Sequence, residues 1–175
     1  MREELKALSQ IGLIEIKRGA KGGVFVKKFD AQNAIDTISL LIRHQRVSVK
    51  HICEFREILE TTSAAYAIER ATDDDINEMK RRLDQGRQVL LCEAPVYEEF
   101  IQWELGMHRE LARISRNPLF EWLSGSIYID YSPYRSMMKR DLKASAESLY
   151  DWEDIVEAME NREAMRGVSL IREHI

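Results

Sequence analysis

The chain has 175 residues, of which 45% are hydrophobic and 32% charged, and its formal net charge at pH 7 is −4. This length and composition predict a globular, helix-rich protein with one medium domain and a small appendage. Apolar runs stay well below the roughly 18 residues of a membrane span, and the first residues are too charged for a secretory signal, so we expect a cytoplasmic protein.

The N-terminal stretch predicts a short helix followed by a basic β-hairpin. MREELKALSQIG has Leu5, Leu8 and Ile11 at helical spacing and Gly12 as a helix stop, and GLIEIKRGAKGGVFV alternates apolar and polar residues around a glycine-rich turn. Up to Lys28 there are seven basic residues against three acidic ones, so the rest of the chain carries −8. A helix followed by a cationic hairpin is typical of a winged-helix DNA reader, and a solvated hairpin that contacts nothing is the alternative.

After Phe29 the sequence predicts helices only, and it therefore predicts a mainly α fold, an antiparallel bundle of six or seven helices behind the hairpin. Cys53 and Cys92 have no CxxC spacing, so we expect buried thiols rather than a disulfide or a zinc site. From caps and apolar periodicity, the helices are expected at about 30–45, 48–71, 72–91, 95–114, 117–133, 144–160 and 161–175.

Two polar pairs interrupt the apolar pattern of this bundle. Glu104 and His108 are four positions apart, so both project from one face of a helix and offer half a metal site, although such a pair is more often a surface contact. His174 reaches the same place if the last helix packs alongside. Arg56 and Glu60 have the same spacing, which predicts an intrahelical ion pair or, alternatively, an arginine that holds a carboxylate inside the bundle. The sequence contains no nucleophile paired with a base and no phosphate loop, so catalysis has little positive support.

Several segments, in order, resemble one family of bacterial transcription regulators. REELKALSQIGLIEIKRGAKGGVFV resembles the second half of a GntR-type winged helix, and FREILETTSAAYAIERAT, MHRELARISRNPLF and REHI resemble the FadR-type ligand-binding domain called FCD. The resemblance implies a DNA-binding head at residues 1–28 and an all-helical, dimerising effector domain at residues 29–175. Such regulators commonly sense small organic acids, and many hold a divalent metal ion in the bundle.

The resemblance also implies residues for DNA contact. Arg2 corresponds to an arginine at which relatives contact DNA, Arg18 and Gly19 fall at the wing tip, and Lys21 lies in the same turn. Relatives have further head residues before this point, so we expect the chain as given to bind operator DNA weakly or not at all.

The metal pattern of the family is matched in part. Relatives place an aspartate four residues before a histidine and two further histidines twenty-two residues apart, and these positions hold Glu104, His108, Trp152 and His174 here. An indole nitrogen only donates hydrogen bonds, so Trp152 cannot ligate. Glu104, His108 and His174 could still hold zinc, nickel or manganese with open positions. The alternative is a metal-free pocket with Trp152 as a wall, in which an anionic effector binds directly to Arg56, His108, Asn117 and His174.

We expect the effector to act by a population shift that changes the spacing of two DNA-binding heads in a homodimer. The dimer seam is expected on the apolar faces of the first two bundle helices. Two other functions stay open: a metal-dependent hydrolase or lyase with Glu104 as base, and a ligand-free dimerisation module with a sealed core.

Overall fold

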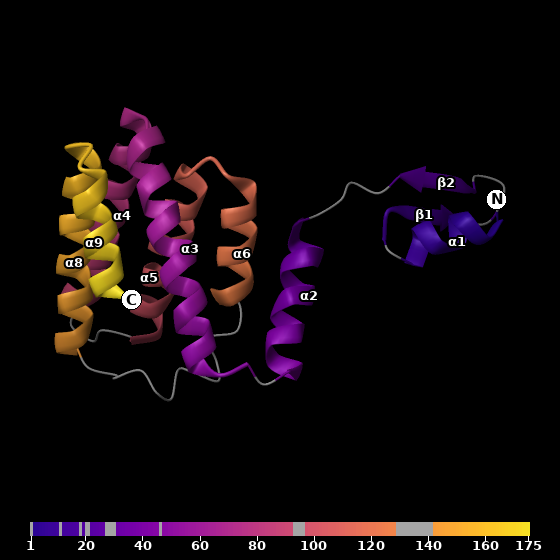
Figure 1. Ribbon diagram of the computed structural model, residues 1–175, viewed down its shortest axis with the longest axis horizontal. Coiled ribbons are helices and arrows are strands. Elements are labelled where there is room, and N and C mark those ends of the chain that lie inside the picture. Colours follow the sequence, from indigo (N-terminus) through magenta and orange to yellow (C-terminus); the bar gives the residue numbers. More distant parts are fainter. Residues whose placement is uncertain are drawn as a thin grey trace. The chain divides into compact units, whose positions relative to one another are not determined.

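The computed structural model describes residues 2–10, 12–17, 19, 22–26, 31–45, 47–92, 97–128 and 142–175 (Figure 1). The chain forms two compact units, Met1–Ala34 and Ile35–Ile175. In the part of the chain that the structure describes, every helix is too short or too polar to cross a membrane.

The first unit contains helix α1 (Arg2–Gln10) and an antiparallel hairpin of β1 (Ile14–Lys17) and β2 (Gly23–Val26). The predicted helix stop is confirmed: Gly12 has φ +77°, its N–H donates to the Ser9 carbonyl, and the Leu13 N–H donates to the Leu8 carbonyl. These two bonds form a Schellman motif, in which glycine tolerates the left-handed conformation.

One of the four predicted DNA-contact residues is fully described. Gly19 sits in the hairpin turn with φ +110°, and its carbonyl accepts from the Gly22 N–H at 2.8 Å. Arg18 and Lys21 lie outside the described residues, as does the side chain of Arg2.

The second unit is the predicted helical bundle (Figure 1). α3 packs against α5, α6, α8 and α9, while α4 packs against α5 and α8. Helix α2 begins before the boundary between the two units. The described helices from there on are α2 (Ala31–His44), α3 (Val49–Arg70), α4 (Asp73–Leu91), α5 (Tyr97–Ile114), α6 (Pro118–Tyr128), α8 (Leu142–Glu160) and α9 (Ala164–His174).

Side-chain caps begin three of these helices at the predicted starting positions. Ser48 accepts from the His51 N–H at the start of α3, and Thr72 forms a capping box with Asp75 at the start of α4. Asn117 accepts from the Leu119 N–H through Oδ1 at 3.1 Å and so starts α6. Each cap satisfies backbone N–H groups that have no partner within the helix.

The core of the bundle lies between α3, α4, α5, α8 and α9, where Ile68, Met79, Met107 and Trp152 are fully buried. The two cysteines are not part of it. The prediction that Cys53 and Cys92 are buried was wrong, because both are exposed. Cys53 lies off the buried face of α3, and Cys92 is the C-cap residue of α4.

Candidate functional site

Three side chains from two helices converge inside the bundle: Glu104 and His108 of α5 and His174 of α9. One ligand atom from each lies within 4.8 Å of the others. The His108 and His174 side chains are only 3% and 4% exposed. The interpretation of Glu104 and His108 as a surface contact is therefore wrong.

His108 contacts a buried carboxylate of α3, that of Glu60, through its Nδ1 atom. Its Nδ1 lies 2.6 Å from Oε2 of Glu60, whose Oε1 accepts from Nε of Arg56, also at 2.6 Å. Burial alone would raise the pKa of the Glu60 carboxyl, but His108 and Arg56 together hold this pKa well below its usual range. Glu60 is therefore ionised at neutral pH, and the predicted Arg56–Glu60 ion pair is confirmed.

His174 has an equivalent partner on α8. Its Nδ1 lies 3.0 Å from Oδ2 of Asp151, and its Nε2 lies 3.6 Å from Oε1 of Glu104. Burial, and then the neighbouring His108, lower the pKa of His174 below its usual value, although Asp151 and Glu104 oppose this shift. His174 is therefore neutral at pH 7, which is the form that binds metal ions.

Both imidazoles thus have a carboxylate at Nδ1: the buried Glu60 for His108 and the half-exposed Asp151 for His174. The carboxylate favours the tautomer with hydrogen on Nδ1, which leaves the lone pair on Nε2. Histidines that bind metal ions in proteins characteristically donate their other nitrogen to a carboxylate in this way. The donor set of two imidazole nitrogens and one carboxylate oxygen fits a divalent transition metal with open positions.

Trp152 is fully buried beneath the two histidines and packs edge-on against them, with ring centroids 4.9 Å from His108 and 5.2 Å from His174. Its Nε1 has no hydrogen-bond partner among the described residues. Trp152 therefore fixes the ring positions and supplies no ligand atom.

A small cavity of about 90 Å³ opens at this cluster. It brings together three of the five predicted effector-binding residues, with Trp152 beneath them, but not Asn117, whose side chain caps α6. The residues that line the cavity are Arg56, Ile101, Glu104, Leu105, His108, His174 and Ile175.

Sequence reasoning did not identify the carboxylates behind the histidines. Glu60 was assigned only to Arg56, four positions away on its own helix, and Asp151 was not singled out. Both act on a histidine of another helix, so no spacing within one helix reveals them.

The comparisons with known proteins agree with this architecture. The FCD domain family matches residues 51–175. The chain is 31% identical over 123 residues to the HTH-type transcriptional repressor NanR of Cronobacter sakazakii, covering 69% of this chain and 45% of that protein. It is 27% identical over 127 residues to the HTH-type transcriptional regulator LutR of Bacillus subtilis, covering 73% and 55% respectively. The chain spans about half the length of these curated relatives.

Solved structures show the same fold at low identity. A GntR of Streptococcus agalactiae superposes with a TM-score of 0.65 at 16% identity, covering 99% of this chain and 77% of that chain. E. coli McbR/YncC superposes with a TM-score of 0.63 at 14% identity, covering 99% and 78% respectively. These likenesses concern the fold alone.

Proposed function

Because this chain belongs to the FCD-domain family of GntR-type regulators, we propose that it regulates transcription by binding a small carboxylate effector, together with a divalent metal ion, inside the helical unit. The single observation that carries the proposal is the convergence of Glu104, His108 and His174, with each histidine backed by a carboxylate. Zinc, nickel and manganese all accept this mixture of nitrogen and oxygen donors.

The charges around the cavity favour a metal-assisted site over direct binding of an anion. Among the described residues at this cluster, the carboxylates of Glu60, Glu104 and Asp151 outnumber the guanidinium of Arg56. When bound, a divalent cation supplies the positive charge that an effector carboxylate needs here. Arg56 is already engaged by Glu60, and Asn117 lies elsewhere, which argues against the metal-free alternative.

The cavity argues against one of the two other functions considered, and the relatives favour a sensor over the second. A ligand-free dimerisation module would need a sealed core around Arg56 and His108, where a cavity of about 90 Å³ lies. The relatives named above are transcriptional regulators, and we propose a sensor rather than a hydrolase or lyase with Glu104 as base.

We further propose that residues 1–28 belong to the DNA-binding head and residues 29–175 to the effector domain. Arg2, Arg18, Gly19 and Lys21 would contact operator DNA. An effector at Glu104, His108 and His174 would hold α5 and α9 together and, through Glu60, α3 as well. In a homodimer, effector binding would favour one arrangement of these helices. This population shift would change the spacing of the two heads and therefore the affinity for operator half-sites.

A calorimetric titration tests the metal site. The purified chain is first stripped of metal with a chelator and is then titrated with zinc, nickel or manganese. We expect one saturable site per chain. Glu60→Gln should weaken affinity about 10- to 100-fold, because the amide no longer orients His108 as an ionised carboxylate does. Glu57→Gln, on the exposed side of the same helix, is the matched control and should bind as wild type does.

Carboxylates added to the metal-loaded chain complete the test. Saturable thermal stabilisation without any product is the expected result. Turnover of a carboxylate would contradict the sensor, and the absence of a saturable metal site, or full affinity after His174→Ala, would contradict the metal site.

A further inference from the structure

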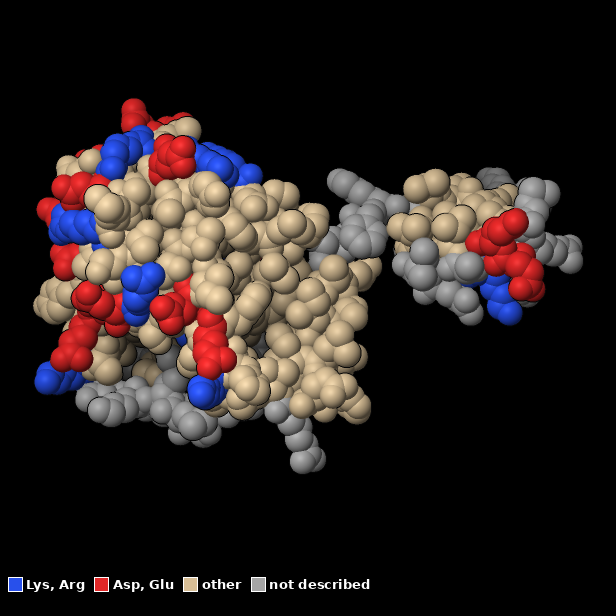
Figure 2. Space-filling model, viewed as in Figure 1, with Lys and Arg blue, Asp and Glu red and all other residues tan. Residues whose placement is uncertain are grey.

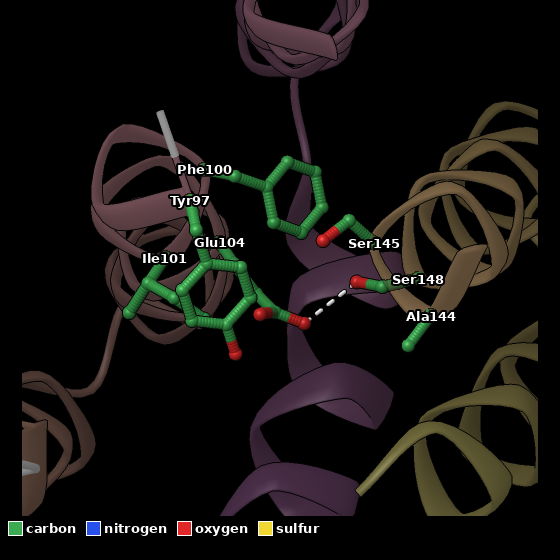
Figure 3. Close-up of a pocket in the computed structure, with 7 residues that line it drawn as sticks. All are labelled: Tyr97, Phe100, Ile101, Glu104, Ala144, Ser145 and Ser148. Atoms are coloured by element: carbon green, nitrogen blue, oxygen red, sulfur yellow. Dashed lines mark hydrogen bonds between the residues drawn. The ribbon is translucent and has the colours of Figure 1, made fainter. Parts of the chain in front are cut away.

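A second cavity, of about 190 Å³, adjoins the first one between α5 and α8 (Figure 3). Ile101 and Glu104 line both cavities, so the Glu104 carboxylate stands where they meet. Figure 3 shows Tyr97, Phe100, Ile101 and Glu104 of α5 on one side and the α8 residues Ala144, Ser145 and Ser148 on the other.

The walls of this cavity are apolar with a few hydroxyl groups. Phe100 and Ile101 present hydrocarbon, whereas Tyr97, Ser145 and Ser148 each carry a hydroxyl group. Such a combination suits a short chain that has apolar carbons and at most neutral hydrogen-bonding groups.

Among the described residues that line this cavity, Glu104 is the single charged one, and a hydrogen bond fixes its position. The Ser148 hydroxyl donates to Oε1 of Glu104 at 2.6 Å, and the same oxygen lies 3.6 Å from Nε2 of His174 (Figure 3). Of the side chains that the structure describes here, a second negative charge in this cavity would therefore meet a carboxylate and no cation, at a site partly removed from water.

We propose that this second cavity holds the remainder of the effector, and that the effector is a monocarboxylate with a short, uncharged tail rather than a dicarboxylate. The inference rests on the proposed function, because the carboxylate end is assigned to the cluster of Glu104, His108 and His174. The tail then lies between Phe100 and Ser145, which makes α8 as well as α5 part of the sensing surface.

Matched carboxylates test this proposal on the zinc-loaded chain. Acetate has no tail, hexanoate has an uncharged tail, and adipate is a six-carbon acid with a second carboxylate at the far end. We expect hexanoate to bind at least tenfold more tightly than acetate or adipate in calorimetry, with the same order of thermal stabilisation.

A cavity-filling variant locates the tail. Ala144 lines the second cavity, whereas Ala146, two residues further along α8, lines a separate groove with Leu90 and Tyr150. Ala144→Phe should lower hexanoate affinity at least tenfold and leave the affinities for zinc and acetate unchanged. Ala146→Phe, the control on the same helix, should leave all three affinities unchanged.

The outcomes separate this inference from the proposed function. If zinc or all of the carboxylates fail to bind the wild-type chain, the proposed function is overturned. If zinc and acetate bind but adipate binds as tightly as hexanoate, the uncharged-tail proposal is overturned and the metal-assisted sensor stands. Circular dichroism confirms that each variant is folded, and the wild-type panel decides the matter even if Ala144→Phe does not fold.

Discussion

Asp75 is a buried carboxylate that ties the start of α4 to the end of α5. It accepts hydrogen bonds from the Thr72 N–H at 2.9 Å and from Arg113 Nη2 at 2.7 Å, and it also pairs with Arg116. Burial alone would raise the pKa of the Asp75 carboxyl, but these hydrogen bonds and charges lower it to about 2. Folding therefore favours the ionised form of Asp75.

This lowered pKa predicts a specific dependence of stability on pH. The pKa is 3.8 in an unfolded chain and about 2 in the fold, so the stabilisation is fully present above pH 3.8 and is lost as pH falls through 2. Because the two arginines are partly exposed, we expect Asp75→Asn to lower the free energy of unfolding by about 1 to 2 kcal/mol at pH 7. About half of that difference should remain at pH 3.

Urea unfolding at pH 7 and pH 3 measures both values. Asp74→Asn changes an exposed residue in the same turn and is the control, with an expected effect of a few tenths of a kcal/mol. A difference between wild type and Asp75→Asn that is as large at pH 3 as at pH 7 would show that ionisation of Asp75 does not contribute.

Residues of the candidate site were predictable only where their spacing lies within one helix. Glu104 and His108, four positions apart, and the Arg56–Glu60 pair can be recognised directly in the sequence. His174 was expected at the site on condition that the last helix packs alongside, and the resemblance to a family added its place in the metal pattern. The contact of Asp151 with His174, and the whole second cavity, depend on how α5, α8 and α9 pack, which no local pattern encodes.

At the scale of elements, the contact between α3 and α9 depends on a glycine, Gly167 of α9. A Cβ added at Gly167 of α9 would lie 2.1 Å from Cδ1 of Ile68, a residue of α3 that is fully buried. An added methyl group would therefore displace the Ile68 side chain, which is packed in the core. His174 lies seven positions further along α9, so a shift of this helix at Gly167 would also move His174 relative to Glu104.

Gly167→Ala should destabilise the bundle. Overpacking in a filled core costs about 1 to 3 kcal/mol, and the better helix propensity of alanine offsets about 1 kcal/mol of that. Gly106→Ala is the control, because among the described residues a Cβ there would meet Arg82 Nη1 alone, at 3.5 Å. We expect this substitution to leave stability unchanged or slightly raised. Thermal unfolding of both variants gives the comparison, and equal melting temperatures for the two would contradict close packing at Gly167.

Helix positions were predictable to within a few residues, because caps and apolar periodicity are local signals. The last helix begins at Ala164 rather than at the predicted residue 161. Arg162 adopts φ +58°, which interrupts the helical conformation between α8 and α9. The cysteines show where residue type misleads: burial follows the face of the helix, and Cys53 faces outward whatever its intrinsic preference.

At the scale of the whole molecule, α3 connects the candidate site to a surface. Its buried face carries Arg56 and Glu60, and its exposed side carries Phe55 and Ile58, which are 43% and 69% exposed. Leu40 and Leu41 of α2 are exposed as well, and Figure 2 shows a broad area without charged residues over α2 and α6. Exposed apolar side chains on the two consecutive helices α2 and α3 are typical of an interface.

We therefore propose that the chain dimerises through the exposed apolar residues of α2 and α3. Ile58→Glu should weaken the dimer at least tenfold, since a charge at an apolar interface loses its hydration without gaining a partner. Met165→Glu is the control, because Met165 of α9 is 91% exposed and lies outside this surface. Sedimentation equilibrium at micromolar concentration measures the association. If Ile58→Glu leaves the wild-type dimer intact and Met165→Glu disrupts it, the interface lies on α9 instead. An effector at His174 would then act on the second subunit directly through α9.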